Sequence, residues 1–79
     1  MTEEPISEKR EVRLRAEFVE LNKLLKFENV VMSGGEAKVA ISNGHVLVNG
    51  EVELRIRRKL VAGDRVFVAG TEFSILPSA

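Results

Sequence analysis

The chain lacks cysteine, tryptophan and tyrosine, and its only histidine is His45. Without cysteine there can be no disulfide and no thiolate metal site, and one histidine cannot hold a metal without further ligands. No apolar run approaches the ~18 residues of a membrane-spanning helix, and the N-terminus lacks a basic stretch followed by an apolar one. These absences predict a cytoplasmic protein with no membrane segment, metal site or leader.

An excess of either charge is also missing, because twelve Lys and Arg balance twelve Asp and Glu in 79 residues. Net charge therefore gives no support to a polyanion partner, although its distribution does. Between Phe18 and Gly70, eight bases face six acids, and four of the bases form one dense cluster: Arg55, Arg57, Arg58 and Lys59. A chain of this length has room for a single core.

The first part of the chain divides into a tail, a strand and a helix. Residues 1–10 are polar and show no apolar period, which predicts a mobile tail before a single domain over residues 11–79. Glu11 to Phe18 alternates as a strand with one buried face does. From Val19 to Phe27, leucines recur at helical spacing, which predicts a short helix.

A second helix is predicted to begin at Ser33, whose hydroxyl can cap the amide of Glu36 while Glu36 reaches back to the amide of Ser33. Asn43-Gly44 ends this helix, since either residue can take the left-handed cap. Its apolar stripe is narrow and suits a close approach to another helix: Ala37, Ala40 and Ile41.

Turn signals divide the rest of the chain into antiparallel strands. Asn49-Gly50, flanked by two apolar runs, is the strongest short hairpin signal. Gly63-Asp64 and Ala69-Gly70 mark two further turns. The predicted fold class is α+β, with two short helices packed on a small antiparallel sheet.

The basic cluster is the strongest candidate site. In an extended segment Arg55, Arg57 and Lys59 would share one face, with Arg58 on the other. Their spacing of about 6.6–7 Å, two strand rises, is close to that of successive phosphates along a nucleic-acid strand. Arginine also binds phosphate oxygens through two parallel hydrogen bonds. The alternative is a solvated edge strand that is kept charged to prevent aggregation.

Other features carry weaker signals. Lys26 and Lys38 lie on separate predicted helices and matter only if the fold brings them beside the arginines. Ser33-Gly34-Gly35 lacks the spacing of a nucleotide-binding loop and is better explained as a helix cap. Phe18 and Phe27 are expected to pack in the core, which leaves no platform on which bases could stack.

Nothing in the chain predicts an enzyme. His45 follows a turn and has no serine, cysteine or acid placed to partner it. Asp64 is expected to hold its turn through its side chain, and Glu51 and Glu53 resemble solvated strand positions. We expect no catalytic residue, no cofactor and no small-molecule substrate.

The order of these motifs resembles the S4-like (alpha-L) RNA-binding domain. The resemblance is carried by Leu24-Leu25-Lys26, by Ser33 to Lys38, by Gly44 to Gly50 with its Val-Asn-Gly, and by Val61-Ala62-Gly63-Asp64. The Ser-Gly-Gly-x-Ala-Lys opening and the arginine-rich run before Leu60 are similar to the small stand-alone bacterial members of the YbcJ/YaaA type. The resemblance covers about Phe18 to Leu76.

The resemblance implies two packed helices on a small sheet and an L-shaped surface for structured RNA, ribosomal or transfer RNA being candidates. We therefore expect a cytoplasmic, non-catalytic, monomeric RNA-binding module. Many family members have arginine where this chain has Gly34, which implies modest rather than tight binding. The alternative is a protein-interaction or accessory module whose basic face meets an acidic protein partner. The implied RNA-binding residues are Lys26, Lys38, Arg55, Arg57, Arg58 and Lys59.

Overall fold

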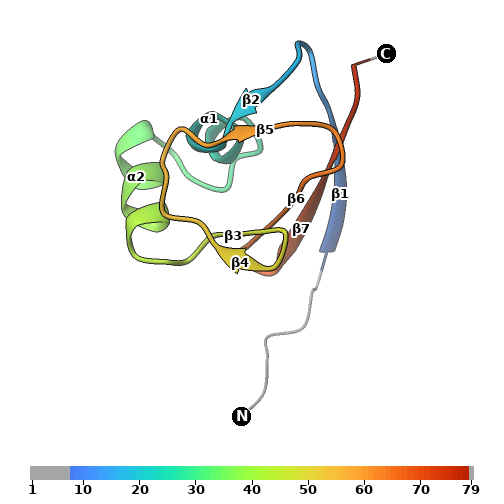
Figure 1. Cartoon of the computed structure of the whole chain (residues 1–79). Helices are drawn as coiled ribbons and strands as arrows, with labels where there is room; N and C mark the ends of the chain where they lie inside the picture. Colours follow the sequence, from blue (N-terminus) through green and yellow to red (C-terminus); the bar gives the residue numbers. More distant parts are fainter. Residues whose placement is uncertain (1–7, 79) are drawn as a thin grey trace.

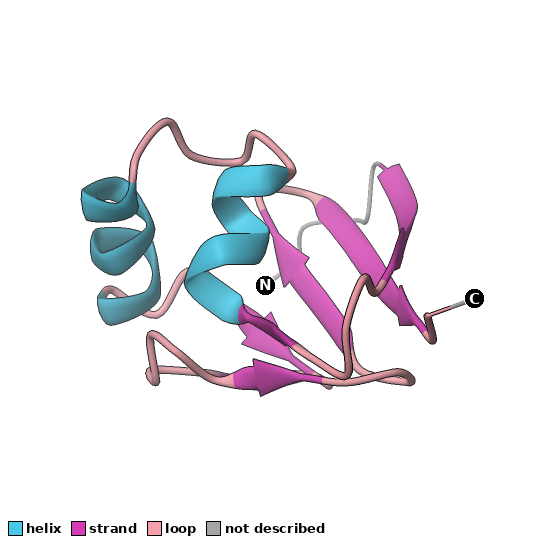
Figure 2. Cartoon of the chain, turned by 90° about the horizontal axis from the view of Figure 1, so that it is seen from above, coloured by secondary structure: helices cyan, strands magenta, loops and turns pink. Residues whose placement is uncertain are grey.

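The computed structural model describes residues 8–78, in which two helices lie together on one side of the strands (Figure 1, Figure 2). This arrangement confirms the predicted α+β class and its two short helices. No helix among the described residues is long and apolar enough to span a membrane. Along the chain the elements are β1 (Glu8–Arg13), β2 (Val19–Glu20), α1 (Leu21–Phe27), α2 (Gly34–Ser42), β3 (Leu47–Val48), β4 (Glu51–Val52), β5 (Lys59–Leu60), β6 (Arg65–Val68) and β7 (Thr71–Leu76).

The main sheet has five strands in the order β1-β7-β6-β3-β4, and β2 and β5 form a separate pair. The pairs β3–β4, β3–β6 and β6–β7 are antiparallel, as predicted. Strand β1, however, pairs with β7 in parallel. The sheet that was predicted to be antiparallel is therefore mixed, with one parallel pair. An alternating pattern identifies a strand but not its partner, and these two strands come from opposite ends of the chain.

Strand β1 begins and ends earlier than the predicted strand over Glu11 to Phe18. Its ladder stops where the amide of Leu14 donates to the carbonyl of Leu76, at 3.0 Å, because β7 ends there. Phe18 lies beyond this point and is exposed. At its other end β1 takes in the last three residues of the expected tail; residues 1–7 lie outside the described residues, and the division into a tail and one domain stays a prediction.

Helix α1 begins at Leu21 rather than Val19, because residues 19–20 pair with β5 instead. A helix start leaves backbone amides without partners inside the helix. Here the first two amides of α1 donate to the carbonyls of Arg58 and Ile56, at 2.9 and 3.0 Å. The start of α1 is therefore joined to the basic segment.

Helix α2 has the predicted cap with one change. The hydroxyl of Ser33 accepts a hydrogen bond from the amide of Glu36 at 3.2 Å, as expected. The carboxylate of Glu36, however, accepts from the amide of Met32, at 2.7 Å, rather than from Ser33. The chain enters the helix extended at Ser33, which brings the preceding amide within reach. At the other end Gly44, with φ 79°, takes the left-handed position.

The core lies between the helices and the larger sheet. Ala37 and Ile41 of the small-residue stripe are fully buried, and α2 packs there against α1. Ala40, the third member, is only partly buried. The largest fully buried side chains come from both helices, from the strands and from the segment before β3: Phe73, Leu21, Leu24, Leu25, Ile41, Leu60, Ile75, Val46 and Val66.

Two of the predicted turns are hydrogen-bonded to each other. Asn49 and Gly50 have φ values of 55° and 87°, as a tight two-residue hairpin requires. The side-chain amide of Asn49 donates to Asp64 at 3.1 Å, and its oxygen accepts from the amide of Arg65 at 2.9 Å. The second carboxylate oxygen of Asp64 accepts from the amide of Val61 at 2.8 Å, which confirms that Asp64 holds its own turn.

Candidate nucleic-acid interface

The basic cluster is folded as a turn, not as the extended strand that the sequence predicts. Only Lys59 belongs to a strand, whereas the residues before it turn back, with the amide of Arg58 donating to the carbonyl of Arg55 at 3.3 Å. We call residues 55–58 the arginine turn. The proposed alternation of Arg55, Arg57 and Lys59 along one face is therefore wrong. The cause lies in a neighbouring carboxylate and in the start of α1, which both bind this segment.

The carboxylate of Glu53 organises the arginine turn. Its two oxygens accept from Arg55 through the backbone amide at 2.9 Å, Nε at 3.0 Å and Nη2 at 3.0 Å. One of them also accepts from Nη1 of Arg58 at 2.7 Å. The carboxylate thus holds two guanidinium groups and one backbone amide in fixed positions. The carbonyls of Ile56 and Arg58 are held from the other side by the first amides of α1.

The ion pair of Glu53 with the two arginines combines a buried carboxylate with charged hydrogen bonds. Glu53 is only 7% exposed, although we expected a solvated strand position. Hydrogen bonds from Arg55, and then from Arg58, lower the pKa of Glu53 to about 2, against burial, which raises it. Glu53 is therefore ionised at neutral pH. A charged donor–acceptor contact of this kind is stronger than a neutral one.

The four cations surround a shallow hollow of about 520 Å³ that is lined by Arg55, Arg57, Arg58 and Lys59. Arg55 keeps 72% of its side chain exposed and Arg58 keeps 26%, so both still face solvent beside their ion pairs. Arg57 makes no hydrogen bond or ion pair within residues 8–78. The turn therefore brings these four predicted residues around one hollow.

Lys26 and Lys38, the other two predicted residues, do not line this hollow. Lys26 lies in the last turn of α1, whereas the arginine turn is bound at the first turn of that helix. Lys38 is exposed on α2. At a rise of about 1.5 Å per residue, Lys26 is roughly 6 Å along the helix axis from Asn22. Both lysines remain candidate residues at the margin of the site.

The sequence predicts the wrong environment for three side chains. Glu53 was placed in solvent, and the one signal for its role was its position two residues before Arg55. Phe18 and Phe27 were placed in the core, but they are 39% and 65% exposed. Phe27 could have been found, because with 3.6 residues per turn it lies about 120° from the centre of the leucine stripe of α1.

The phenyl ring of Phe18 contacts the basic cluster. The Nζ atom of Lys59 lies 4.8 Å from the centroid of this ring, within the range of a cation–π interaction. The contact is possible because β2, which follows Phe18, pairs with β5, which contains Lys59. Phe18 thus limits the freedom of the lysine side chain beside the arginine turn.

The structure gives no support to a phosphate-binding role for Ser33 or a catalytic role for His45. Ser33 serves as the cap of α2, with the Glu36 carboxylate in the same turn, so this loop presents an acid where an anion would bind. His45 is exposed. Within the part of the chain that the structure describes, no group of three His, Cys, Asp or Glu side chains could hold a metal ion.

Comparison with known proteins identifies the family. A model of the S4 domain matches residues 12–76, which is most of the chain. The chain belongs to the S4 domain family. YbcJ of Escherichia coli (strain K12) is 48% identical over 58 residues, which cover 73% of this chain and 83% of YbcJ. "Probable ribosome maturation protein RlbA" of Bacillus subtilis (strain 168) is 41% identical over 59 residues, 75% of this chain and 83% of that protein.

The fold of this S4 domain also matches a solved structure. The solution structure of YbcJ from E. coli is described as revealing an alpha-L motif involved in RNA binding. It aligns with a TM-score of 0.61 and 38% sequence identity, and covers 96% of this chain and 91% of YbcJ. The resemblance to the alpha-L fold and to the small YbcJ type is therefore confirmed.

Proposed function

We propose that this S4 domain is a non-catalytic RNA-binding module whose basic hollow contacts the backbone of structured RNA. The observation that carries the proposal is the arginine turn, in which a buried carboxylate holds two guanidinium groups beside a free arginine and a lysine. Cations that are held in place lose little side-chain entropy when they bind phosphate. Family membership and the names of the relatives support the same ligand.

The proposed contacts are to phosphate and 2′-hydroxyl groups, which position a protein on RNA without reading its sequence. Arg57 and Lys59 are the central residues, with Arg55 and Arg58 beside them and Lys26 and Lys38 at the margin. Ribosomal or transfer RNA would supply the folded backbone. We further propose that the domain acts as a cytoplasmic monomer that carries out no reaction.

Removal of two cations tests the site. Arg57→Ala combined with Lys59→Ala should weaken binding to a structured RNA about tenfold or more, because two phosphate contacts are lost. Both side chains are exposed, so the thermal unfolding midpoint should change little. Filter binding and calorimetric unfolding measure the two effects.

A matched control removes one arginine and one lysine elsewhere. Lys9→Ala with Arg65→Ala takes the same two residue types from exposed positions of β1 and β6. This variant should bind RNA almost as the unchanged protein does. Equal weakening by both double variants would show that total charge, not the arginine turn, determines binding. Unfolding of the Arg57/Lys59 variant would assign those residues to the fold.

A second candidate function is an accessory module that binds an acidic protein through the same hollow. The zero net charge favours this function, since RNA-binding domains usually carry a basic excess. Affinity capture with and without ribonuclease distinguishes the two. Partners that disappear after RNA digestion support the RNA-binding function, whereas partners that remain support the accessory one.

A further inference from the structure

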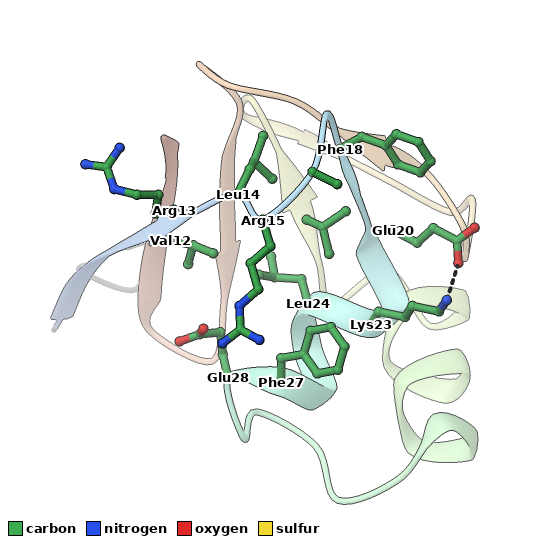
Figure 3. Close-up of a pocket in the computed structure, with 12 residues that line it drawn as sticks. Val12, Arg13, Leu14, Arg15, Phe18, Glu20, Lys23, Leu24, Phe27 and Glu28 are labelled. Carbon is green, nitrogen blue, oxygen red and sulfur yellow. Dashed lines mark ion pairs between the residues drawn. The ribbon is translucent and has the colours of Figure 1, made fainter. Parts of the chain in front are cut away.

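A second concave surface lies between the end of β1 and helix α1 (Figure 3). It has a volume of about 670 Å³ and is walled by the segment 12–20 on one side and by α1 on the other. We call it the Phe27 groove. Its volume falls within the roughly 300–1,000 Å³ that is typical of small-molecule sites. It is therefore large enough to hold one nucleotide.

The groove combines a buried apolar floor with exposed aromatic rings. Leu14 and Leu24, which line it, are 6% and 1% exposed and belong to the core. Phe27 and Phe18, which line it as well, are 65% and 39% exposed. Single exposed apolar residues are common, but two aromatic rings around one groove are a stacking surface. A nucleobase is a flat partner of the right chemistry for such a surface.

The charges around the groove leave one arginine free. Both acids are engaged, since Glu20 pairs with Lys23 at 3.7 Å and Glu28 pairs with Arg10 at 3.8 Å. Arg15 makes no hydrogen bond or ion pair within residues 8–78. Figure 3 shows its guanidinium group extending along the groove toward the end where Phe27 and Glu28 lie. A free guanidinium beside an exposed ring can bind the phosphate of a nucleotide whose base stacks on that ring.

The groove is linked to the basic cluster through the contact between Phe18 and Lys59. Phe18 lines the groove, and the Nζ atom of Lys59 lies 4.8 Å from the centroid of the Phe18 ring. Lys59 in turn lines the hollow of the arginine turn. An RNA whose backbone lies on the arginine turn could therefore pass a neighbouring nucleotide over Phe18 into the groove.

We propose that the Phe27 groove binds one unpaired nucleotide adjoining the structured RNA, with its base stacked on Phe27 and its phosphate at Arg15. This inference rests on the proposed function, because the paired region is assigned to the arginine turn. It adds a base-stacking contact, whereas the sequence predicts no aromatic platform on which a base could stack. The domain would then prefer a junction between paired and unpaired RNA over a continuous duplex.

The test compares two RNA probes on the full chain: a blunt stem-loop, and the same stem-loop with a short single-stranded extension at its 5′ or 3′ end. One of the extensions should strengthen binding about tenfold, within the range that one stacked base contributes. Phe27→Ala and Phe27→Leu should both abolish this gain and leave the affinity for the blunt stem-loop within about twofold. Arg15→Ala should reduce the gain.

Two control variants distinguish an effect on the groove from an effect on the fold or on the arginine turn. Met32→Ala removes a side chain that is 87% exposed outside the groove, and it should keep the full gain. The Arg57/Lys59 double variant should weaken binding to both probes equally. If neither extension strengthens binding, or if the Phe27 variants weaken both probes equally, the proposal is overturned.

A direct measurement makes the result independent of stem binding. Nuclear magnetic resonance can follow the ring protons of Phe27 while a short single-stranded oligonucleotide is added alone. Upfield shifts of these protons, smaller with Arg15→Ala, support the groove even if the blunt stem-loop is not bound and the proposed function fails. No shift overturns the groove assignment. Shifts caused by an apolar peptide but not by the oligonucleotide would assign the groove to a protein partner and also overturn it.

Discussion

At the scale of single residues, Glu53 has the largest effect on the candidate site. A carboxylate that is 7% exposed would be costly without partners, and here Arg55 and Arg58 supply four hydrogen bonds. The same bonds fix the direction of both guanidinium groups. Glu53 thus neutralises one positive charge of the basic cluster and fixes the positions of two of its arginine side chains.

Glu53→Gln should lower the free energy of unfolding by about 1–3 kcal/mol, because charged hydrogen bonds are lost at a buried position. It should also weaken RNA binding, although it raises the net charge by one, because the guanidinium groups are no longer held. Denaturant unfolding and RNA titration measure the two effects. The nearby exposed acid Glu51 provides the control, since Glu51→Gln makes the same charge change. Tighter binding by Glu53→Gln would contradict the ordering role.

The same residue predicts a pH dependence of stability. Since the pKa of Glu53 is lowered from 4.5 to about 2 in the folded chain, the folded state binds its proton less readily than the unfolded state does. The contribution of the ionised Glu53 carboxylate to folding stability is therefore complete above pH 4.5 and is lost as the pH falls toward 2. The stability difference between the unchanged chain and Glu53→Gln should shrink across this range. A constant difference would show that the carboxylate charge contributes nothing.

At the scale of elements, the turns are coupled. Asn49 belongs to the β3–β4 hairpin and Asp64 to the turn before β6, and their side chains are hydrogen-bonded at 3.1 Å. The oxygen of Asn49 also binds the amide of Arg65, at the first residue of β6. This contact gives a physical reason why a Val-Asn-Gly element and a later Gly-Asp occur together. Each turn residue stabilises its own turn and the position of the other.

A double-mutant cycle tests the coupling. Asn49→Ala and Asp64→Ala should each lower the free energy of unfolding by about 1–2 kcal/mol. The double variant should lose less than the sum, by about 0.5–1 kcal/mol, because the shared hydrogen bond can be lost only once. Unfolding in urea measures all four proteins. Strict additivity would mean that the two turns are energetically independent.

At the scale of the whole molecule, the zero net charge conceals an uneven distribution of charged side chains. Glu53, beside the arginine turn, and Glu20 and Glu28, which line the Phe27 groove, are engaged in ion pairs. Arg57 and Arg15 make no such pair within residues 8–78. Local distribution, rather than the sum of charges, therefore determines what the surface can attract.

The salt dependence of RNA binding should reflect this local charge. If four or five phosphates are engaged, the logarithm of the affinity should fall with the logarithm of salt concentration with a slope of roughly −3 to −4.5. Removing Arg57 and Lys59 should make the slope less steep by about 1.5–2. Binding measured over a range of salt concentrations gives both slopes. A nearly flat curve would exclude phosphate contacts as the main source of affinity.

Some features of this protein could be predicted from the sequence because the interactions that produce them are local. The cap at Ser33, the helix stop at Gly44, the Asn49-Gly50 hairpin and the turn at Asp64 each depend on residues a few positions apart. Their backbone angles and short-range hydrogen bonds act within one turn of chain, so the sequence is enough to find them. The family resemblance rests on these same cap and turn residues, and it was confirmed.

Long-range contacts determined the remainder. The parallel pairing of β1 with β7, the binding of residues 56 and 58 by the first amides of α1 and the exposure of Phe27 all depend on partners that chain order does not name. An alternating pattern is compatible with either strand direction, and an acid or a phenyl ring is compatible with either burial or exposure. The sequence by itself therefore determined the turns, the helices and the presence of a basic cluster. Only the tertiary structure decided the cluster's shape, because that shape also depends on the first amides of α1, which come much earlier in the chain and bind the carbonyls of Ile56 and Arg58.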